Sequence, residues 1–422
     1  MRAPVIGYAG MTHLGINSAV AAAEKRYETV CYDPDVDRIR ALARQELPVA
    51  EPDLAELLTK NAHRITFTSD PGKIAACDVV YVSPDVPTDD LGQSDLREIG
   101  SLIGEIEPLL NTDAVMVVLS QVPPGFTRGR ACAGGRLFYQ VETLIFGRAV
   151  ERALRPERFI VGCDDPAGEL PAAFVHFLAS FGCPILRMRY ESAELAKISI
   201  NMCLVASVSV ANTLAELCES IGADWSEIVP ALKLDKRIGQ FSYLAPGLGI
   251  AGGNLERDLT TVCRLADQYG TDAGVVRASQ ANSRHRRDWV LRTLYREVLG
   301  TVEEPVIGVL GLAYKQDTHS TKNSPSIALL EHLKQYRVRV YDPVVSATLP
   351  HPLCHVAVSE LDACEGVDVL VVMTPWRQFG NVDPAQMAQR MRGALVVDPY
   401  EVLNAATCRA AGLRYLTLGV QH

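Results

Sequence analysis

The chain has 422 residues, of which 48% are hydrophobic and 22% are charged, and its formal net charge is −9 at pH 7. This length exceeds that of a typical single hydrophobic core, so we expect two or three domains. The negative charge argues against a protein that binds nucleic acid or an anionic membrane surface.

The cysteines and the apolar runs indicate the compartment. The 11 cysteines are scattered, their number is odd and no C-x-x-C occurs, which is typical of reduced cytosolic thiols rather than of a disulfide framework. The N-terminus lacks a signal-peptide pattern, and no apolar run approaches the roughly 20 residues of a membrane span. The His and Cys residues show no metal-ligand spacing. We therefore expect a cytoplasmic protein without a membrane anchor or a metal centre.

The first 190 residues alternate between apolar strands and helical patterns. Residues 4–9 form an apolar run, a helical pattern follows through Glu24, and a second strand at residues 28–32 ends at Asp33. Largely apolar runs at 78–82 and 114–119 are typical of buried parallel strands. Residues 1–190 are therefore predicted to form a doubly wound α/β domain of the Rossmann type.

A long helical pattern follows and leads to a second α/β segment. Residues 191–224 run helical without a clear break, which at ~1.5 Å per residue is roughly 50 Å. A largely apolar helix of this length predicts a spine that buries surface against a second subunit, so residues 191–300 are assigned to a helical dimerisation domain and a homodimer or higher homo-oligomer is expected. Residues 301–422 are predicted to form a second Rossmann-like domain, with strands at 305–310, 337–341, 368–373 and 394–398.

A dinucleotide-binding motif follows the first strand. Residues 10–15, GMTHLG, have the six-residue frame of G-x-G-x-x-G with Thr12 in the middle position. Gly15 lets the helix pack on the strand, and the helix N-terminus offers amides to a pyrophosphate. Asp33 closes the second strand, where a carboxylate accepts both ribose hydroxyls and repels a 2′-phosphate. These features predict NAD as the cofactor, with a shifted loop or weaker binding because of Thr12.

Further motifs extend over nearly the whole chain. They are LPVAEPDL at 47–54, VPT at 86–88, SQVPPG at 120–125, ETLIFG at 142–147, ELAKISIN at 194–201, DKRIG at 235–239, GLGIAGGNLERD at 247–258 and LGLAYK at 310–315. In this order they resemble the motifs of the UDP-glucose/GDP-mannose dehydrogenase family. The resemblance implies two Rossmann-like domains joined by a long central helix, with NAD in the first and a nucleotide sugar held by the second.

The resemblance also implies a particular chemistry. The family oxidises a nucleotide-sugar alcohol twice: a Cys captures the intermediate aldehyde as a thiohemiacetal, and the resulting thioester is hydrolysed to a uronate. In this chain Asn254 stands in place of that Cys, and Phe146 replaces a second Glu. A carboxamide cannot form a thiohemiacetal. We therefore expect a single two-electron oxidation of a sugar hydroxyl, most simply a secondary one that ends as a ketone.

Three other functions stay open. A ketone and NADH that both remain bound would permit redox-neutral epimerisation, and a uronate could form through the aldehyde hydrate without a Cys. A non-catalytic nucleotide-sugar-binding protein is the third, against which the retained residues Lys197, Asn201 and Asp258 argue. The nucleotide also stays open between UDP, GDP and TDP, because residues 319–322 and 398–401 depart from the family pattern.

The predicted site follows from the matched positions. Lys197 and Asn201 are four residues apart, so they share a helix face and can converge on one oxygen as an oxyanion-type site. Asp258, through a water, is the candidate to receive the hydroxyl proton. Glu142, Asn254 and Gln121, which replaces a family Thr, complete the catalytic set. Cofactor contacts are predicted for Gly10, Thr12, His13, Leu14, Gly15, Asp33, Arg38, Pro87, Thr88 and Ser120. Substrate contacts are predicted for Glu142, Thr143, Leu144, Lys197, Asn201, Arg237, Tyr243, Gly247, Gly249, Gly252 and Lys315.

Overall fold

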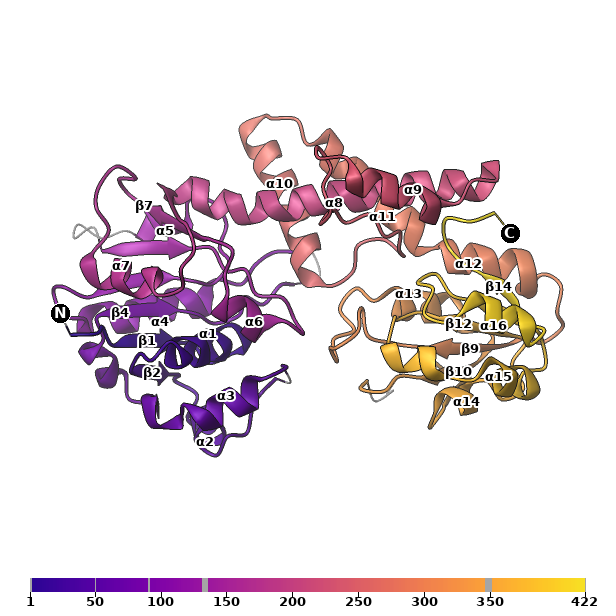
Figure 1. Cartoon of the computed structure of the whole chain (residues 1–422), viewed down its shortest axis with the longest axis horizontal. Coiled ribbons are helices and arrows are strands. Elements are labelled where there is room, and N and C mark those ends of the chain that lie inside the picture. The colour runs from indigo at the N-terminus through magenta and orange to yellow at the C-terminus, as the bar shows by residue number, and fades with distance from the viewer. Residues whose placement is uncertain (1, 50, 90–91, 131–135, 346–350, 422) are drawn as a thin grey trace. The chain divides into compact units, whose positions relative to one another are not determined.

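The structure, a computed structural model, describes residues 2–49, 51–89, 92–130, 136–345 and 351–421. The chain divides into two units, Met1–Ile200 and Asn201–His422. Each unit contains one sheet of the Rossmann type (Figure 1), which confirms the predicted α/β class with two such domains and a long central helix. The further division into domains 1–190, 191–300 and 301–422 stays a proposal.

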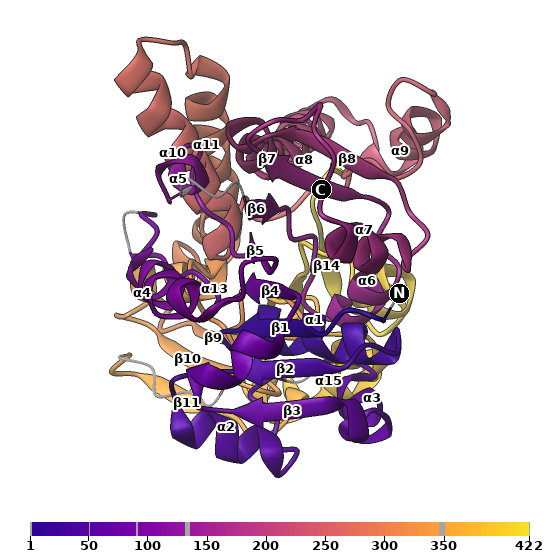
Figure 2. The ribbon, with the colours of Figure 1, turned by 90° about the vertical axis from the view of Figure 1, so that its left-hand side faces the viewer.

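The sheet of the first unit has eight strands in the order β3-β2-β1-β4-β5-β6-β7-β8, which can be followed upward in Figure 2. Every neighbouring pair is parallel except β6 and β7. The order reverses between β1 and β4, and this switch point is where open α/β sheets bind their ligands. The strands are β1 (Ile6–Ala9), β2 (Thr29–Tyr32), β3 (Ile65–Thr68), β4 (Val79–Val82), β5 (Val115–Val118), β6 (Leu137–Gln140), β7 (Phe159–Cys163) and β8 (Ile185–Arg189).

Apolar residues on both faces of this sheet explain why its central strands are buried. Strands β1, β4 and β5 have sequences IGYA, VVYV and VMVV with every residue buried, as expected for parallel strands covered on two sides. Two separate apolar clusters result, one containing Ile6 and Tyr8, the other Ala9 and Val80. The helices are α1 (His13–Glu24), α2 (Val36–Ala43), α3 (Leu54–Lys60), α4 (Arg97–Ile106), α5 (Phe126–Arg130), α6 (Ala149–Leu154) and α7 (Ala172–Ala179).

Helix α8 (Tyr190–Ile221) has 32 residues, close to the predicted 191–224. It ends before Gly222, whose φ of +77° is the left-handed conformation that commonly terminates helices. Its most apolar 18-residue window has a mean hydropathy of 1.6, and 33% of that window is buried. Among the described helices α8 alone meets the length and composition of a membrane span. The prediction from uninterrupted apolar runs did not single out α8, because Ser and Asn residues interrupt the run although the mean hydropathy of the helix is high.

The second unit combines a helical segment with a six-stranded parallel sheet in the order β11-β10-β9-β12-β13-β14. Glu219 of α8 accepts hydrogen bonds from Arg286 Nη2 (2.9 Å), Trp289 Nε1 (2.9 Å) and Gly419 N (3.0 Å), so one carboxylate joins three segments. The helices are α9 (Trp225–Leu234), α10 (Gly253–Tyr269), α11 (Gly274–Arg287), α12 (Trp289–Leu294), α13 (Pro325–His332), α14 (Glu360–Ala363), α15 (Pro384–Arg390) and α16 (Ala405–Ala410). The strands are β9 (Val306–Leu310), β10 (Arg337–Tyr341), β11 (Cys354–Val356), β12 (Val369–Val372), β13 (Leu395–Val397) and β14 (Arg414–Leu416).

Candidate active site

The loop between β1 and α1, with the first turn of α1, has two of the three glycines of the dinucleotide-binding motif, Gly10 and Gly15. Gly10 has a φ of +94°, and a Cβ placed there would lie 2.7 Å from the backbone N of Pro84. A Cβ on Gly15 would lie 2.0 Å from the carbonyl oxygen of Gly10. Side chains at these two positions would collide with backbone, so the helix packs against the loop as predicted. Leu14, between them, is buried in the core.

Asp33 lies at the end of β2, beside this loop. Its side chain is 2% exposed, and Oδ2 accepts hydrogen bonds from Met11 N and from Arg38 Nη1, both at 2.7 Å. The carboxylate thus fixes both the glycine loop and the Arg38 guanidinium. The residues present fit NAD: the glycine loop and α1 would hold its pyrophosphate, and Asp33 and Arg38 its adenosine ribose.

Thr12, in the middle glycine position, is engaged by the loop that follows β4. Asp85 N donates to Thr12 Oγ1 over 2.7 Å, and His13 N donates to Asp85 Oδ2 over 2.9 Å. The sequence-based site omitted Asp85, although it lies between Ser83 and the predicted residue Pro87. Of the other residues predicted here, Pro87 is exposed, Thr88 forms an isolated bridge with Ser94, and the buried Ser120 hydroxyl donates to Pro84 O over 2.5 Å.

His13 contacts two segments through its side chain. Its Nε2 lies 2.8 Å from Glu51 Oε1, and its ring stacks on Phe146 with centroids 4.1 Å apart. The fully buried Glu51 carboxylate also accepts hydrogen bonds from Gly147 N at 3.0 Å and Ala149 N at 3.2 Å. Glu51 therefore connects the cofactor loop with the segment that carries Glu142. This role was missed, although the motif containing Glu51 had been recognised.

Lys197 and Glu142 form an ion pair within the first unit. Lys197 Nζ lies 2.7 Å from Glu142 Oε1 and donates to the Glu142 carbonyl over 3.2 Å. Glu142 Oε2 accepts from Leu144 N over 2.8 Å. Because both side chains are largely buried, at 13% and 16% exposure, this pair holds the ammonium in one direction. Exclusion from water makes such an interaction stronger than a surface salt bridge.

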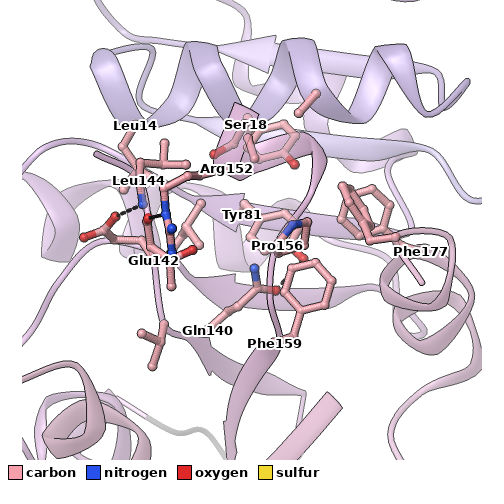
Figure 3. Close-up of a pocket in the computed structure, with 17 residues that line it drawn as sticks. Leu14, Ser18, Tyr81, Gln140, Glu142, Leu144, Arg152, Pro156, Phe159 and Phe177 are labelled. Carbon is pink, nitrogen blue, oxygen red and sulfur yellow. Dashed lines mark hydrogen bonds between the residues drawn. The ribbon is translucent and has the colours of Figure 1, made fainter. Parts of the chain in front are cut away.

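The segment around Glu142 covers a small pocket of about 50 Å³ (Figure 3). Thr143 and Leu144, two predicted substrate residues, line it, and Arg152 Nε donates to Thr143 O over 2.6 Å. The same unit positions Gln121, which is 8% exposed. Glu194 of α8 accepts from Gly125 N and Thr127 N at 2.6 and 2.8 Å, so it fastens the loop that follows Gln121. Burial raises the pKa of the Glu194 carboxyl, and these backbone hydrogen bonds oppose that rise.

Asn201 and Asp258 meet within the second unit. Asn201 Nδ2 donates to Asp258 Oδ2 over 2.5 Å, and Arg257 Nε lies 3.4 Å from Asp258 Oδ1. All three residues are buried. Asp258 therefore orients the Asn201 amide, and the Arg257 guanidinium balances its charge. Arg257 was not among the site residues predicted from the sequence.

The glycine loop at 247–253 is held by three neighbouring segments. Gly247 N donates to Asn212 Oδ1 over 2.8 Å, and Ile250 N donates to Ser283 Oγ over 2.7 Å. Gly249 has a φ of +76°, and an added Cβ would lie 2.4 Å from Ser283 O. Gly252 has a φ of +81°, and its Cβ would lie 2.7 Å from the Tyr314 ring. Both glycines are thus required by close approach as well as by backbone conformation.

Asn254 is the second residue of α10, directly after this loop. Its side chain is exposed, and no side-chain hydrogen bond to it occurs within the described ranges. Residues of the first helical turn lie beside free backbone amides, where negative charge is stabilised. Asn254 therefore offers a neutral amide, without a nucleophile, at the end of a glycine loop.

The remaining predicted substrate residues lie elsewhere in the second unit. Arg237 is exposed and its Nη2 is 2.7 Å from Asp235 Oδ2, and Tyr243 is half exposed. Lys315 Nζ lies 5.8 Å from the centroid of the Tyr314 ring, so it is close to the residue that packs on Gly252. Across the described residues, no group of three or more His, Cys, Asp or Glu side chains is placed to hold a metal ion.

A Rossmann sheet with a glycine loop and an acid at the end of β2, together with a second such sheet in the same chain, indicates a dinucleotide-binding protein. Comparison with protein families specifies the class further. The UDP-glucose/GDP-mannose dehydrogenase family matches with its NAD-binding domain at residues 1–176, its central domain at 191–284 and its UDP-binding domain at 308–405. The chain belongs to this family of NAD-dependent nucleotide-sugar dehydrogenases.

Individual relatives match over almost their whole length. A UDP-glucose 6-dehydrogenase from Pseudomonas aeruginosa is 30% identical, with 99% of this chain and 97% of the relative covered. The UDP-glucose 6-dehydrogenase TuaD of Bacillus subtilis is 28% identical over 98% of this chain and 93% of its own. The solved structure of a UDP-glucose dehydrogenase from Pyrobaculum islandicum superimposes with a TM-score of 0.87 and 25% identity, covering 100% of this chain and 98% of the other.

Proposed function

We propose that this enzyme oxidises one hydroxyl group of a nucleotide sugar once, to a carbonyl, and that the hydroxyl is a secondary one. The observation that carries the proposal is the side chain of Asn254, an exposed carboxamide in the first turn of α10. By sequence resemblance it occupies the position of the Cys that captures an aldehyde in this family. A ketone has no further hydrogen to give, so a secondary hydroxyl makes that Cys unnecessary.

NAD, when bound, accepts the hydride from the sugar carbon. Lys197 would oppose the negative charge that grows on the sugar oxygen, since its ammonium is already oriented by Glu142 at 2.7 Å. Pre-oriented donors of this kind are each worth on the order of 10²–10³ in rate. Asn201 lies one helical turn further along α8, so its amide can support the same oxygen.

Asp258 is the proposed acceptor of the hydroxyl proton, through a water. Its carboxylate is held by the Asn201 amide and by Arg257. These contacts fix the direction of the carboxylate, which suits a group that relays a proton through a positioned water.

The apolar side chain of Phe146 supports the proposal that the substrate carries a modified sugar. Its ring is 38% exposed and stacks on His13 at 4.1 Å, in the segment that also carries Glu142. Where the family resemblance expects a second acid for the second oxidation, this chain presents an apolar ring. The proposal therefore extends to a sugar that carries a further chain at its reactive carbon.

Two aspects of the molecule belong to the same proposal. We infer that it acts as a homodimer or a higher homo-oligomer and that it works in the cytoplasm. A second candidate function, a uronate made from UDP-glucose without Cys, is favoured by the relatives, which are UDP-glucose 6-dehydrogenases at 28 to 30% identity.

Mass spectrometry of the products separates these functions. The purified protein is incubated with NAD and a panel of UDP-, GDP- and TDP-sugars, including UDP-glucose and extended-chain sugars. We expect a product that has lost two hydrogen atoms, with one NADH formed per product. A product in which one oxygen replaces two hydrogens, with two NADH, would show that the uronate forms without Cys and would overturn the proposal. An unchanged mass with a new chromatographic peak would indicate epimerisation instead.

A further inference from the structure

The N-terminus of α1 is already occupied by a side chain of the same unit. Asp85 Oδ2 accepts the hydrogen bond of the His13 amide over 2.9 Å, and Asp85 N donates to Thr12 Oγ1 over 2.7 Å. Two hydrogen bonds of opposite direction therefore join residues 72 and 73 positions apart in the chain. We call this arrangement the Thr12–Asp85 clasp. Thr12, the N-cap residue, makes no cap hydrogen bond of its own with its side chain.

This position is where the Rossmann fold binds phosphate. The amides at the N-terminus of the first helix point toward the pyrophosphate of a dinucleotide, and the helix dipole favours negative charge there. His13 N belongs to this set because α1 begins at His13. A carboxylate that accepts from this amide imitates a phosphate oxygen and competes with it.

The charges that surround the clasp increase this competition. Asp33 is buried at the end of β2 and shares its oxygen Oδ2 between Met11 N and Arg38 Nη1. The pKa of Glu98, at the start of α4, is raised by burial and by the carboxylates of Asp33 and Asp85, while Arg38 opposes that rise. Three acids and one guanidinium therefore lie in this region, and of the three acids Asp85 is the one that accepts a hydrogen bond from an amide of the first turn of α1.

We propose that Asp85 determines the affinity of this enzyme for its cofactor: its carboxylate occupies the amide that the NAD pyrophosphate requires, and NAD binds only when the Thr12–Asp85 clasp opens. The exposed position of Asp85 allows this movement, because its side chain can turn into solvent without uncovering the core. The hydroxyl of Thr12 is the second element, since it holds the loop of Asp85 against the helix. A cofactor that carries an additional phosphate is repelled more strongly by the Asp85 carboxylate and should therefore bind more weakly than NAD.

The experiment measures equilibrium binding of NAD⁺ and NADH to the full-length protein, by titration calorimetry and by NADH fluorescence, without any substrate. Asp85→Asn removes the charge and keeps the shape, and Asp85→Ala removes the acceptor. We expect the dissociation constant for NAD⁺ to fall about tenfold in Asp85→Ala, because a hydrogen bond to a charged acceptor no longer has to be broken, and to fall by less in Asp85→Asn. Thr12→Gly removes the other half of the clasp and should also lower the dissociation constant.

Asp89→Asn is the matched control, since it removes the same charge from an exposed acid four residues further along the same loop. The gain in binding free energy for NAD⁺ in the double variant Thr12→Gly/Asp85→Ala should be smaller than the sum of the gains in the two single variants, because both changes open one clasp. Thermal melting is recorded in parallel: Asp85→Ala should melt at a lower temperature than the wild type, as expected for a lost helix cap, while it binds NAD⁺ more tightly. An unchanged or weaker affinity in both Asp85 variants would overturn the proposal, and so would an equal gain in Asp89→Asn.

Discussion

Among single residues, Lys197 is the one on which the proposed chemistry depends most directly. Its ammonium is 13% exposed and held by Glu142 at 2.7 Å, so its direction is set before a substrate arrives. Lys197→Ala should lower kcat by about 10²–10³, since the negative charge on the sugar oxygen would lose its main opposing charge. NAD binding should not change. Steady-state NADH formation together with NAD⁺ calorimetry tests both statements.

Lys60→Ala is the corresponding control, because it removes the same charge from an exposed site, where Lys60 pairs with Glu24. A Lys197→Ala enzyme that turns over at the wild-type rate would contradict the assigned role. A Lys197→Ala protein that also loses NAD binding would instead show a structural contribution. The comparison with Lys60→Ala therefore separates the local effect from the change in net charge.

The identities of these residues were predictable, but their partners were not. Lys197, Asn201, Asp258 and Glu142 stand in motifs that resemble a family. The contact between Lys197 and Glu142 joins positions 55 residues apart, and it depends on where α8 begins relative to β6. No local pattern contains that information. The contact of Asp85 with Thr12 was missed for the same reason, because the sheet order brings the loops after β1 and β4 together.

At the scale of elements, sequence periodicity predicted the first βαβ unit, the long helix and the second α/β segment, since apolar spacing largely determines these. The predicted helix extended three residues beyond the C-terminal end of α8, which lies at Ile221. The cause is local: Gly222 adopts a left-handed conformation, which a pattern of apolar residues does not report. The conformation of the 247–253 loop was likewise inaccessible, because Asn212, Ser283 and Tyr314 hold it from distant segments.

That loop gives a prediction at element scale. Gly252→Ala places a Cβ 2.7 Å from the Tyr314 ring at a φ of +81°, so we expect a loss of about 1–3 kcal/mol in the free energy of unfolding. Urea denaturation measures it. In the double variant Gly252→Ala/Tyr314→Ala, the loss of stability caused by the clash with the Tyr314 ring should disappear. The loss caused by the backbone conformation at residue 252 should remain. Gly104→Ala is the control, since its Cβ would meet nothing within 4 Å in helix α4, and an equal loss there would contradict the argument.

At the scale of the whole molecule, the remaining question is what covers α8. Val210, Leu217 and Ile221 are 55%, 51% and 63% exposed, and with Leu214 they are spaced i, i+4, i+7 and i+11, which places them on one helix face. A soluble protein rarely leaves such an apolar stripe in water. The opposite face of α8 packs within the second unit, against residues that include Trp225 and Leu244. A second copy of this chain, with the same stripe, is the occupant we propose.

In the proposed dimer, the change Leu217→Glu should yield a monomer, because a carboxylate within a self-complementary apolar contact would face its own copy. Sedimentation equilibrium at several protein concentrations measures this change. Val275→Glu is the control, since Val275 is 74% exposed on α11 and the substitution adds the same charge away from the stripe. A wild-type protein that sediments as a monomer would contradict the dimer. If the wild-type protein is instead recovered only together with lipid vesicles, the stripe contacts lipid rather than a second subunit, in line with the length and hydropathy of α8.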